Sequence, residues 1–121
     1  MPKILILEDS VIVSKLLASL LKGRGYEVVE CSTVAEAMEN LNDVDCAIID
    51  YKLPDGNGLE VAEKLRRYRP GVSMLLLTAR GQRVPPEAAK RAGIKEYLEK
   101  PANPENIIAL VELYLGRQEA A

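Results

Sequence analysis

Short apolar runs alternate along the chain with longer segments in which apolar residues recur at intervals of three and four. The short runs are rich in branched aliphatic side chains, which is typical of buried β-strands. The longer segments have the period of amphipathic α-helices. The pattern therefore predicts five strands, at Ile4–Leu7, Glu27–Cys31, Cys46–Ile49, Ser73–Leu77 and Glu96–Glu99.

Five helices are predicted, one after each strand. Their apolar faces are Val13, Leu16, Leu17, Leu20 and Leu21; Val34, Ala37, Met38 and Leu41; Val61, Ala62 and Leu65; Ala88, Ala89 and Ala92; and Ile107, Leu110, Val111 and Tyr114. Thr33 with Glu36 has the spacing of a capping box, and Pro86 suits the first turn of the fourth helix. Gly116 follows the last apolar residue of the fifth helix and predicts its end.

Alternating strands and helices indicate an α/β fold with a parallel sheet, right-handed crossovers and helices on both faces. The first, third and fourth strands are continuously apolar, whereas the second and fifth contain glutamates. Central strands of parallel sheets are the most apolar, so the second and fifth strands belong at the edges. We therefore expect a doubly wound, five-stranded sheet of order 2-1-3-4-5, the order of flavodoxin-like folds.

The length of 121 residues and the apolar content of 48% fit a single domain, residues 1–121. Its core is expected over about residues 3–115, with 116–121 as a tail or the start of a linker. No apolar run approaches the roughly 20 residues that span a bilayer, and the first strand begins too early for a signal peptide. We expect a cytoplasmic protein without membrane insertion.

The net charge of −2 and the few aromatic residues argue against direct binding to nucleic acid. The chain has no histidine, which excludes His-based catalysis and His metal ligands within it. The two cysteines are Cys31 and Cys46. The predicted order places a strand between them, about 9 to 10 Å apart, too far for a disulfide. We expect both to be reduced.

Polar side chains follow four of the five predicted strands at the point where each strand ends. These are Glu8 and Asp9, Asp50, Thr78, and Lys100. Ligands of open α/β sheets bind at the carboxyl ends of the strands, so these groups are expected at one rim. Three carboxylates crowded together repel one another unless a cation lies between them. Oxygen ligands alone favour Mg²⁺, with Mn²⁺ as an alternative.

These residues together resemble the receiver domain of two-component response regulators, over essentially residues 3 to 115. The stretch from Asp50 to Gly58, with Leu53-Pro54-Asp55-Gly56, is similar to the loop that follows the third strand in that family. The resemblance implies that Asp50 is the phosphoacceptor. It implies that Asp9 binds the metal directly, that Glu8 acts partly through water, and that the Lys52 carbonyl and Asp50 complete the metal ligands.

The resemblance also assigns roles to the last two strand ends. Thr78 and Lys100 would hold the phosphoryl oxygens, and Lys100-Pro101 resembles the lysine and cis-proline of the family. Tyr97 occupies the position of an aromatic residue that turns inward on phosphorylation and, with Thr78, forms a switch. The switch would change the face formed by the fourth helix, the fifth strand and the fifth helix.

The partners implied by the resemblance are proteins. The phosphodonor would be a phosphohistidine on a sensor histidine kinase or a phosphotransfer protein. The output would be a downstream protein target or an effector domain outside this chain, and a phosphorylation-dependent dimer is an open alternative. In this interpretation the chain is a signalling phosphoacceptor and not an enzyme, apart from assisting its own phosphorylation and dephosphorylation, and it binds no organic cofactor.

Three alternatives use parts of the same pattern. A haloacid-dehalogenase-like phosphatase also combines an aspartate nucleophile, Thr or Ser, Lys and Mg²⁺, but it requires a second aspartate where this chain has Lys52. A flavin-binding module needs a phosphate cradle, which Glu8 and Asp9 would repel. A receiver-like interaction module that ignores phosphate usually lacks a site residue, whereas this chain keeps them all.

Overall fold

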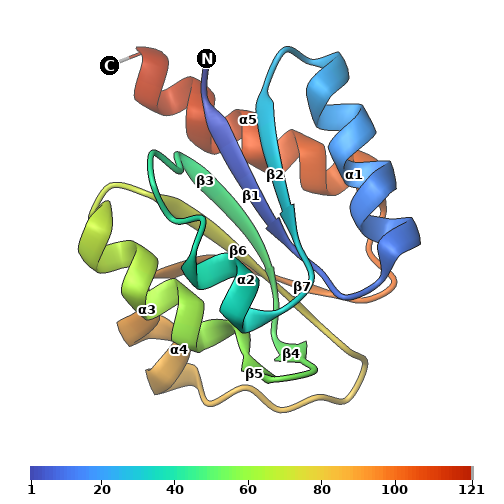
Figure 1. The fold of residues 1–121 in the computed structure, drawn as a ribbon, viewed down its shortest axis with the longest axis vertical. Coiled ribbons are helices and arrows are strands. Elements are labelled where there is room, and N and C mark those ends of the chain that lie inside the picture. Colours follow the sequence, from blue (N-terminus) through green and yellow to red (C-terminus); the bar gives the residue numbers. More distant parts are fainter. Residues whose placement is uncertain (121) are drawn as a thin grey trace.

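A parallel five-stranded sheet forms the centre of the computed structural model, which describes residues 1–120 and the side chains of residues 1–116. Its strands are β1 (Lys3–Leu7), β2 (Glu27–Cys31), β3 (Cys46–Asp50), β6 (Ser73–Thr78) and β7 (Ile94–Glu99). Their order is β2-β1-β3-β6-β7 (Figure 1). The predicted topology is confirmed, because β6 and β7 are the fourth and fifth strands of the sequence-based order.

Between β3 and β6 the chain forms a small antiparallel hairpin that the sequence did not predict. It consists of β4 (Lys52–Leu53) and β5 (Gly56–Asn57). Strands of two residues are too short to show an alternating pattern, so the periodicity of the sequence cannot indicate them. The hairpin lies at the end of the sheet where β3 finishes (Figure 1).

Helices cover both faces of the sheet (Figure 1). The helices α1 (Val11–Gly23) and α5 (Pro104–Ala120) pack on one face through a buried cluster that includes side chains of both helices. The helices α2 (Val34–Met38), α3 (Gly58–Tyr68) and α4 (Pro86–Ala92) pack on the other face through a second cluster. The two clusters share no residue, because alternate side chains of each strand point to opposite faces.

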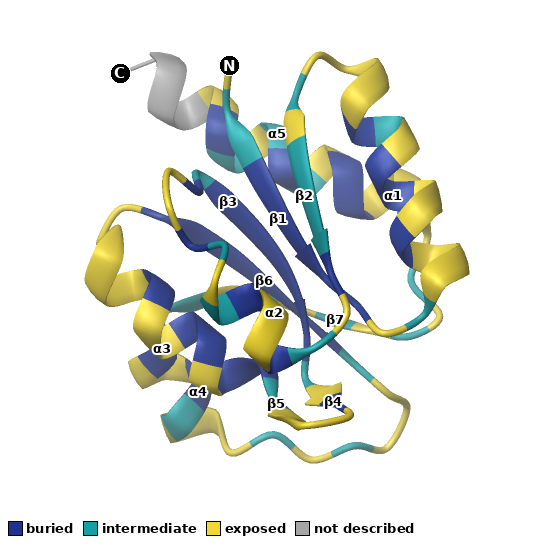
Figure 2. Cartoon of the chain, in the orientation of Figure 1, coloured by how far each residue is buried: buried dark blue, intermediate teal, exposed yellow. Residues whose placement is uncertain are grey.

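Burial explains the strand order. Every residue of β3 is buried, and β1 and β6 are buried except at one end (Figure 2). Strand β2 is only partly buried, and β7 alternates between partly buried and exposed residues, as edge strands do. The glutamates of these two strands therefore remain near solvent, as the sequence pattern predicted.

The apolar face predicted for the first helix is partly wrong. Leu17 and Leu21 are fully buried, but Val13 is 36% exposed and Leu16 is 47% exposed. The stripe of α1 that meets the sheet consists of Ser14, Leu17, Ala18 and Leu21. A helix contacts a sheet along a narrow stripe, so Val13 and Leu16 remain exposed, whereas Leu20 is partly buried against the core.

The ends of two helices also differ from the prediction. Helix α2 ends at Met38, and Leu41 is buried beyond it. Helix α5 continues through Gly116, where the sequence predicted its end, because glycine weakens a helix without breaking it. Residue 121 of the expected tail lies outside the described residues, as do the side chains of residues 117–120. Helix α4 begins at Pro86, as expected.

Cys31 and Cys46 are free and buried, as predicted from the strand order. Burial raises the pKa of the Cys31 thiol to about 11 and that of Cys46 to about 12, which keeps both protonated and unreactive. Within residues 1–120, no helix is both long and apolar enough to cross a membrane.

Gly58 allows a close approach between α3 and the end of β3. Its backbone N–H donates a hydrogen bond of 2.7 Å to the carbonyl oxygen of Tyr51. A Cβ atom at this position would overlap the carbonyl oxygen of Asp50 and the side chain of Ile49. Glycine is therefore required where the first turn of α3 contacts the strand that carries Asp50.

We expect Gly58→Ala to lower the free energy of unfolding by about 1–3 kcal/mol or more, the usual cost of overpacking. Gly23→Ala is the matched control, because an added Cβ at Gly23 meets nothing within 4 Å. Urea unfolding followed by circular dichroism measures both variants. Equal stability of the two variants would contradict the close approach at Gly58.

Candidate functional site

The carboxyl ends of the parallel strands bring together polar side chains that are far apart in sequence. Glu8 and Asp9 follow β1, Asp50 is the last residue of β3, Thr78 is the last residue of β6, and Lys100 follows β7. The strands are parallel neighbours, so their carboxyl ends lie at the same edge of the sheet, with Asp50 opposite Leu77 and Thr78 opposite Glu99. The rim predicted from the sequence is present.

Three carboxylates meet at this rim. One carboxylate oxygen from each of Glu8, Asp9 and Asp50 lies within 4.8 Å of the other two. Glu8 and Asp50 are buried, at 1% and 5% exposure, whereas Asp9 is exposed. Two of the three acids are thus withdrawn from water, where an uncompensated negative charge is costly.

The ammonium group of Lys100 lies between the two buried acids. Its Nζ is 2.8 Å from Oε1 of Glu8 and 2.9 Å from Oδ2 of Asp50. The second carboxylate oxygen of Glu8 accepts a hydrogen bond of 3.1 Å from the backbone N–H of Ser10. Lys100 is joined to Pro101 by a cis peptide bond, as predicted.

The shared environment shifts the pKa values of the cluster in different directions. Burial, opposed by Lys100 and reinforced by Glu8, raises the pKa of Asp50 to about 7. The pKa of Asp9 is lowered, mainly through hydrogen bonding with the Glu8 side chain. Burial opposes the charge of Lys100, but the hydrogen bonds to Glu8 and Asp50 outweigh it and raise its pKa. Lys100 therefore remains a cation.

The donors fit a hard divalent cation. All three side chains offer oxygen, and their atoms are nearly as close as the ligands of one ion, since Mg²⁺–oxygen distances of 2.0–2.1 Å place opposite ligands about 4 Å apart. The Lys100 ammonium group pairs with only two of the three carboxylates, which leaves an excess of negative charge in the cluster. The arrangement is suited to Mg²⁺ or Mn²⁺ together with water and a phosphoryl oxygen.

The unpredicted hairpin forms one wall of this site. The pocket in front of the acids has a volume of about 300 Å³ and is lined by Asp9, Asp50, Lys52, Leu53, Pro54, Ala79, Gln82 and Lys100. Lys52 therefore lies at the site, as expected. Gln82 was missed by the sequence interpretation, because a single glutamine in a loop carries no motif; its side-chain oxygen accepts a hydrogen bond of 2.9 Å from the N–H of Ala79.

Thr78 and Tyr97 lie together in a neighbouring hollow of about 300 Å³, which they line with Gln82, Val84 and Pro86. Tyr97 is 49% exposed on β7. Thr78 is not among the residues that line the pocket in front of the acids. Gln82 borders both spaces, so the structure brings Thr78 beside Tyr97 and places both next to the acidic pocket.

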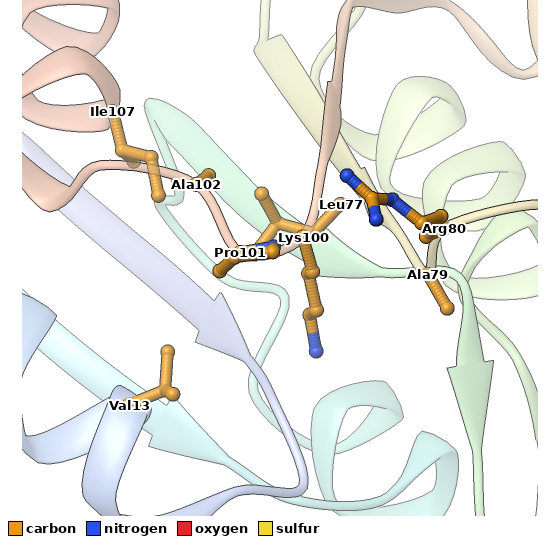
Figure 3. Close-up of a pocket in the computed structure, with 8 residues that line it drawn as sticks. All are labelled: Val13, Leu77, Ala79, Arg80, Lys100, Pro101, Ala102 and Ile107. Atoms are coloured by element: carbon orange, nitrogen blue, oxygen red, sulfur yellow. The ribbon is translucent and has the colours of Figure 1, made fainter.

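A mainly apolar cavity of about 370 Å³ adjoins the site on its other side (Figure 3). It is lined by Val13, Leu77, Ala79, Arg80, Lys100, Pro101, Ala102 and Ile107. In Figure 3, Pro101 and Ala102 lie between Lys100 and Ile107. Ala79 and Lys100 line both this cavity and the acidic pocket, so the two spaces share a wall.

Comparison with known proteins places this geometry in a family. Residues 4–112 match the family model described as the response regulator receiver domain. The sequence is 34% identical over 110 residues to the photosynthetic apparatus regulatory protein RegA of Rhodovulum sulfidophilum, covering 89% of this chain and 60% of RegA. It is 33% identical over 118 residues to the aerobic respiration control protein ArcA of Escherichia coli K12, covering 96% of this chain and 49% of ArcA.

The fold agrees with solved structures. A CheY-like receiver domain protein from Methanospirillum hungatei JF-1 superposes with a TM-score of 0.86 at 30% identity, covering 99% of this chain and 98% of that one. The chain spans less than two thirds of the two curated relatives. From the matched residues, the fold and the strand-end acids, we conclude that the chain belongs to the response regulator receiver domain family of two-component systems.

Proposed function

We propose that Asp50 accepts a phosphoryl group from a phosphohistidine on a partner protein, with Mg²⁺ bound by Glu8, Asp9, Asp50 and the backbone carbonyl of Lys52. The observation that carries this proposal is the position of Asp50. Its buried carboxylate lies beside two further acids and within 2.9 Å of the Lys100 ammonium group. A negatively charged nucleophile next to cationic groups is what transfer of an anionic phosphoryl group requires.

In the transfer step, a carboxylate oxygen of Asp50 forms a bond to phosphorus while the phosphorus–nitrogen bond of the phosphohistidine breaks. The electron pair of that bond stays with the leaving imidazole, and Asp50 becomes an acyl phosphate. Lys100 neutralises charge on the phosphoryl oxygens, and Thr78 contributes a hydroxyl. When bound, Mg²⁺ supplies further positive charge to those oxygens.

The phosphodonor is proposed to be a sensor histidine kinase or a phosphotransfer protein, which covers the outer face of α1. This face carries exposed aliphatic side chains beside the site, with Val11 at 67%, Ile12 at 82% and Leu16 at 47% exposure. Exposed apolar patches of this kind mark contact surfaces for other proteins. The donor would thereby bring its phosphohistidine over Asp50.

The output is proposed to run through Thr78 and Tyr97. Both line one hollow, and Tyr97 is half-exposed on the edge strand β7. Inward movement of Tyr97 would change the face formed by α4, β7 and α5, where Leu113 is also 44% exposed. A downstream protein, an effector domain outside this chain or a second phosphorylated copy would read that change.

We further propose that the chain acts in the cytoplasm as a signalling phosphoacceptor and not as an enzyme of metabolism. Lys52 supports this interpretation, because it lies at the acidic pocket in the position where a phosphatase of the haloacid dehalogenase type needs an acid. A lysine side chain has no carboxyl group that could act as this acid.

Incubation with acetyl phosphate and Mg²⁺ is expected to add one phosphoryl group to the wild-type protein, seen by intact-mass spectrometry. Asp50→Ala should abolish the added mass, because the nucleophile is gone. Chelation of the metal should slow the reaction in the wild type. The proposal fails if no phosphoryl mass appears under these conditions or with a range of phosphohistidine donors.

Asp50→Asn is expected to stabilise the metal-free protein above pH 7. In the folded protein the pKa of Asp50 rises from 3.8 to about 7, so the folded state holds a proton that the unfolded state releases between these pH values. Stability therefore falls as the pH rises through this interval. The variant should lose this part of the pH dependence, and urea midpoints from pH 4 to 8 measure it. Identical stability profiles of the wild type and Asp50→Asn against pH would show that burial does not disfavour the charged form of Asp50.

Ile12→Glu is expected to slow phosphotransfer from a protein donor that phosphorylates the wild type, because the added charge disrupts an apolar contact. Phosphorylation by acetyl phosphate should be unchanged, since Ile12 is 82% exposed and does not line the pocket in front of the acids. Initial rates with both donors give the comparison. If Ile12→Glu and the wild type were phosphorylated by the protein donor at equal rates, the outer face of α1 would not be the donor's contact surface.

A further inference from the structure

The tip of the β4–β5 hairpin is tied to a helix that is distant in sequence. Oδ1 of Asp55 accepts a hydrogen bond of 2.8 Å from the N–H of Val34, and Oδ2 accepts one of 3.0 Å from the N–H of Ala35. These N–H groups belong to the first turn of α2, which has no helical partner for them. The two hydrogen bonds lower the pKa of Asp55, so its carboxylate is charged at neutral pH.

The clamped segment is also the wall of the acidic pocket. Lys52, Leu53 and Pro54 line that pocket, and Asp55 follows Pro54 directly. At its base the hairpin is fixed by Asn57, whose side-chain oxygen accepts a hydrogen bond of 2.9 Å from the N–H of Leu59 and caps α3. Nearer the turn, the buried side chain of Leu53 joins the core. The hairpin is therefore held at its base by α3, along its length by the core, and at its tip by α2.

The approach of the hairpin to α2 is close. A Cβ atom at Gly56 would lie 3.3 Å from Cγ2 of Val34 and 2.8 Å from Oε2 of Glu60. Gly56 thus lets the hairpin lie against α2 and α3, and Asp55 fixes it there. Lys52 belongs to this hairpin and lines the acidic pocket, so the position of the hairpin sets how the Lys52 backbone faces that pocket.

We infer that Asp55 is a positioning residue for the metal site: by clamping the hairpin to the first turn of α2, it sets the affinity of the site for a divalent cation. Asp55 does not reach the ion itself. It holds the segment that presents the backbone of Lys52. The inference rests on the proposed function, because it takes the acidic pocket as the metal site.

The test compares two variants that both remove a cap from α2. Asp55→Ala releases the hairpin and uncaps α2. Thr33→Ala only uncaps α2, because the Thr33 hydroxyl accepts its hydrogen bond of 3.1 Å from the N–H of Glu36 within the same segment. Mg²⁺ affinity is measured by calorimetry on the full chain. We expect Asp55→Ala to weaken this affinity by about tenfold, the lower end of the loss seen when a residue that orients metal ligands is removed. Thr33→Ala should leave it unchanged.

Two further measurements separate positioning from simple destabilisation. Asp55→Asn, which keeps an oxygen that accepts one N–H group, should restore part of the Mg²⁺ affinity. Since coupling between two sites is reciprocal, Mg²⁺ should slow hydrogen exchange at the amides of Val34 and Ala35 in the wild type and in Thr33→Ala. It should not do so in Asp55→Ala.

The outcomes distinguish the two proposals. If the wild type binds no Mg²⁺, the assignment of the metal site fails. If the wild type binds Mg²⁺ and Asp55→Ala binds it as tightly, or if Thr33→Ala weakens binding as much, Asp55 has no positioning role. A Mg²⁺-independent exchange rate at Val34 and Ala35 in the wild type would also overturn the inference.

Discussion

The structure depends on one electrostatic compensation: the ammonium group of Lys100 lies within 2.9 Å of two buried acids from different strands. Glu8 and Asp50 are withdrawn from water at the end of the sheet, where their charges repel each other. The lysine arrives from the edge strand β7, across β6 from Asp50. The two buried carboxylates are therefore compensated only when the strand order, the strand register and the loop after β7 together bring Lys100 beside them. The same arrangement leaves a site with an excess of negative charge.

The strand order and most of the polar residues at the strand ends were predictable from the sequence, because they follow from local patterns. Continuous apolar runs identify β1, β3 and β6 as central, and the polar residue after each run identifies the rim. The sequence also placed Lys52 beside the site. Functional side chains at the ends of strands can be found in this way, because the apolar run identifies the strand and the residue that follows it must lie at the edge of the sheet.

The features that escaped prediction depend on contacts between distant segments or on elements too short for a pattern. Asp55 caps a helix that begins 21 residues earlier in the chain, so no local spacing reveals it. The outward position of Leu16 depends on where α1 meets the sheet, and its own periodicity does not show this. Gly116 resembled a helix end, but α5 continues through it. Gln82 borders two hollows because of how its loop folds.

The complete burial of β3 has a mechanical consequence. A strand packed on both faces and hydrogen-bonded along both edges behaves as a rigid beam, because close-packed interiors resist deformation. A phosphoryl group on its last residue, as proposed for Asp50, would therefore not be accommodated by bending of the strand. The loops around the carboxyl end of the sheet would have to move instead, because they are less tightly packed than β3.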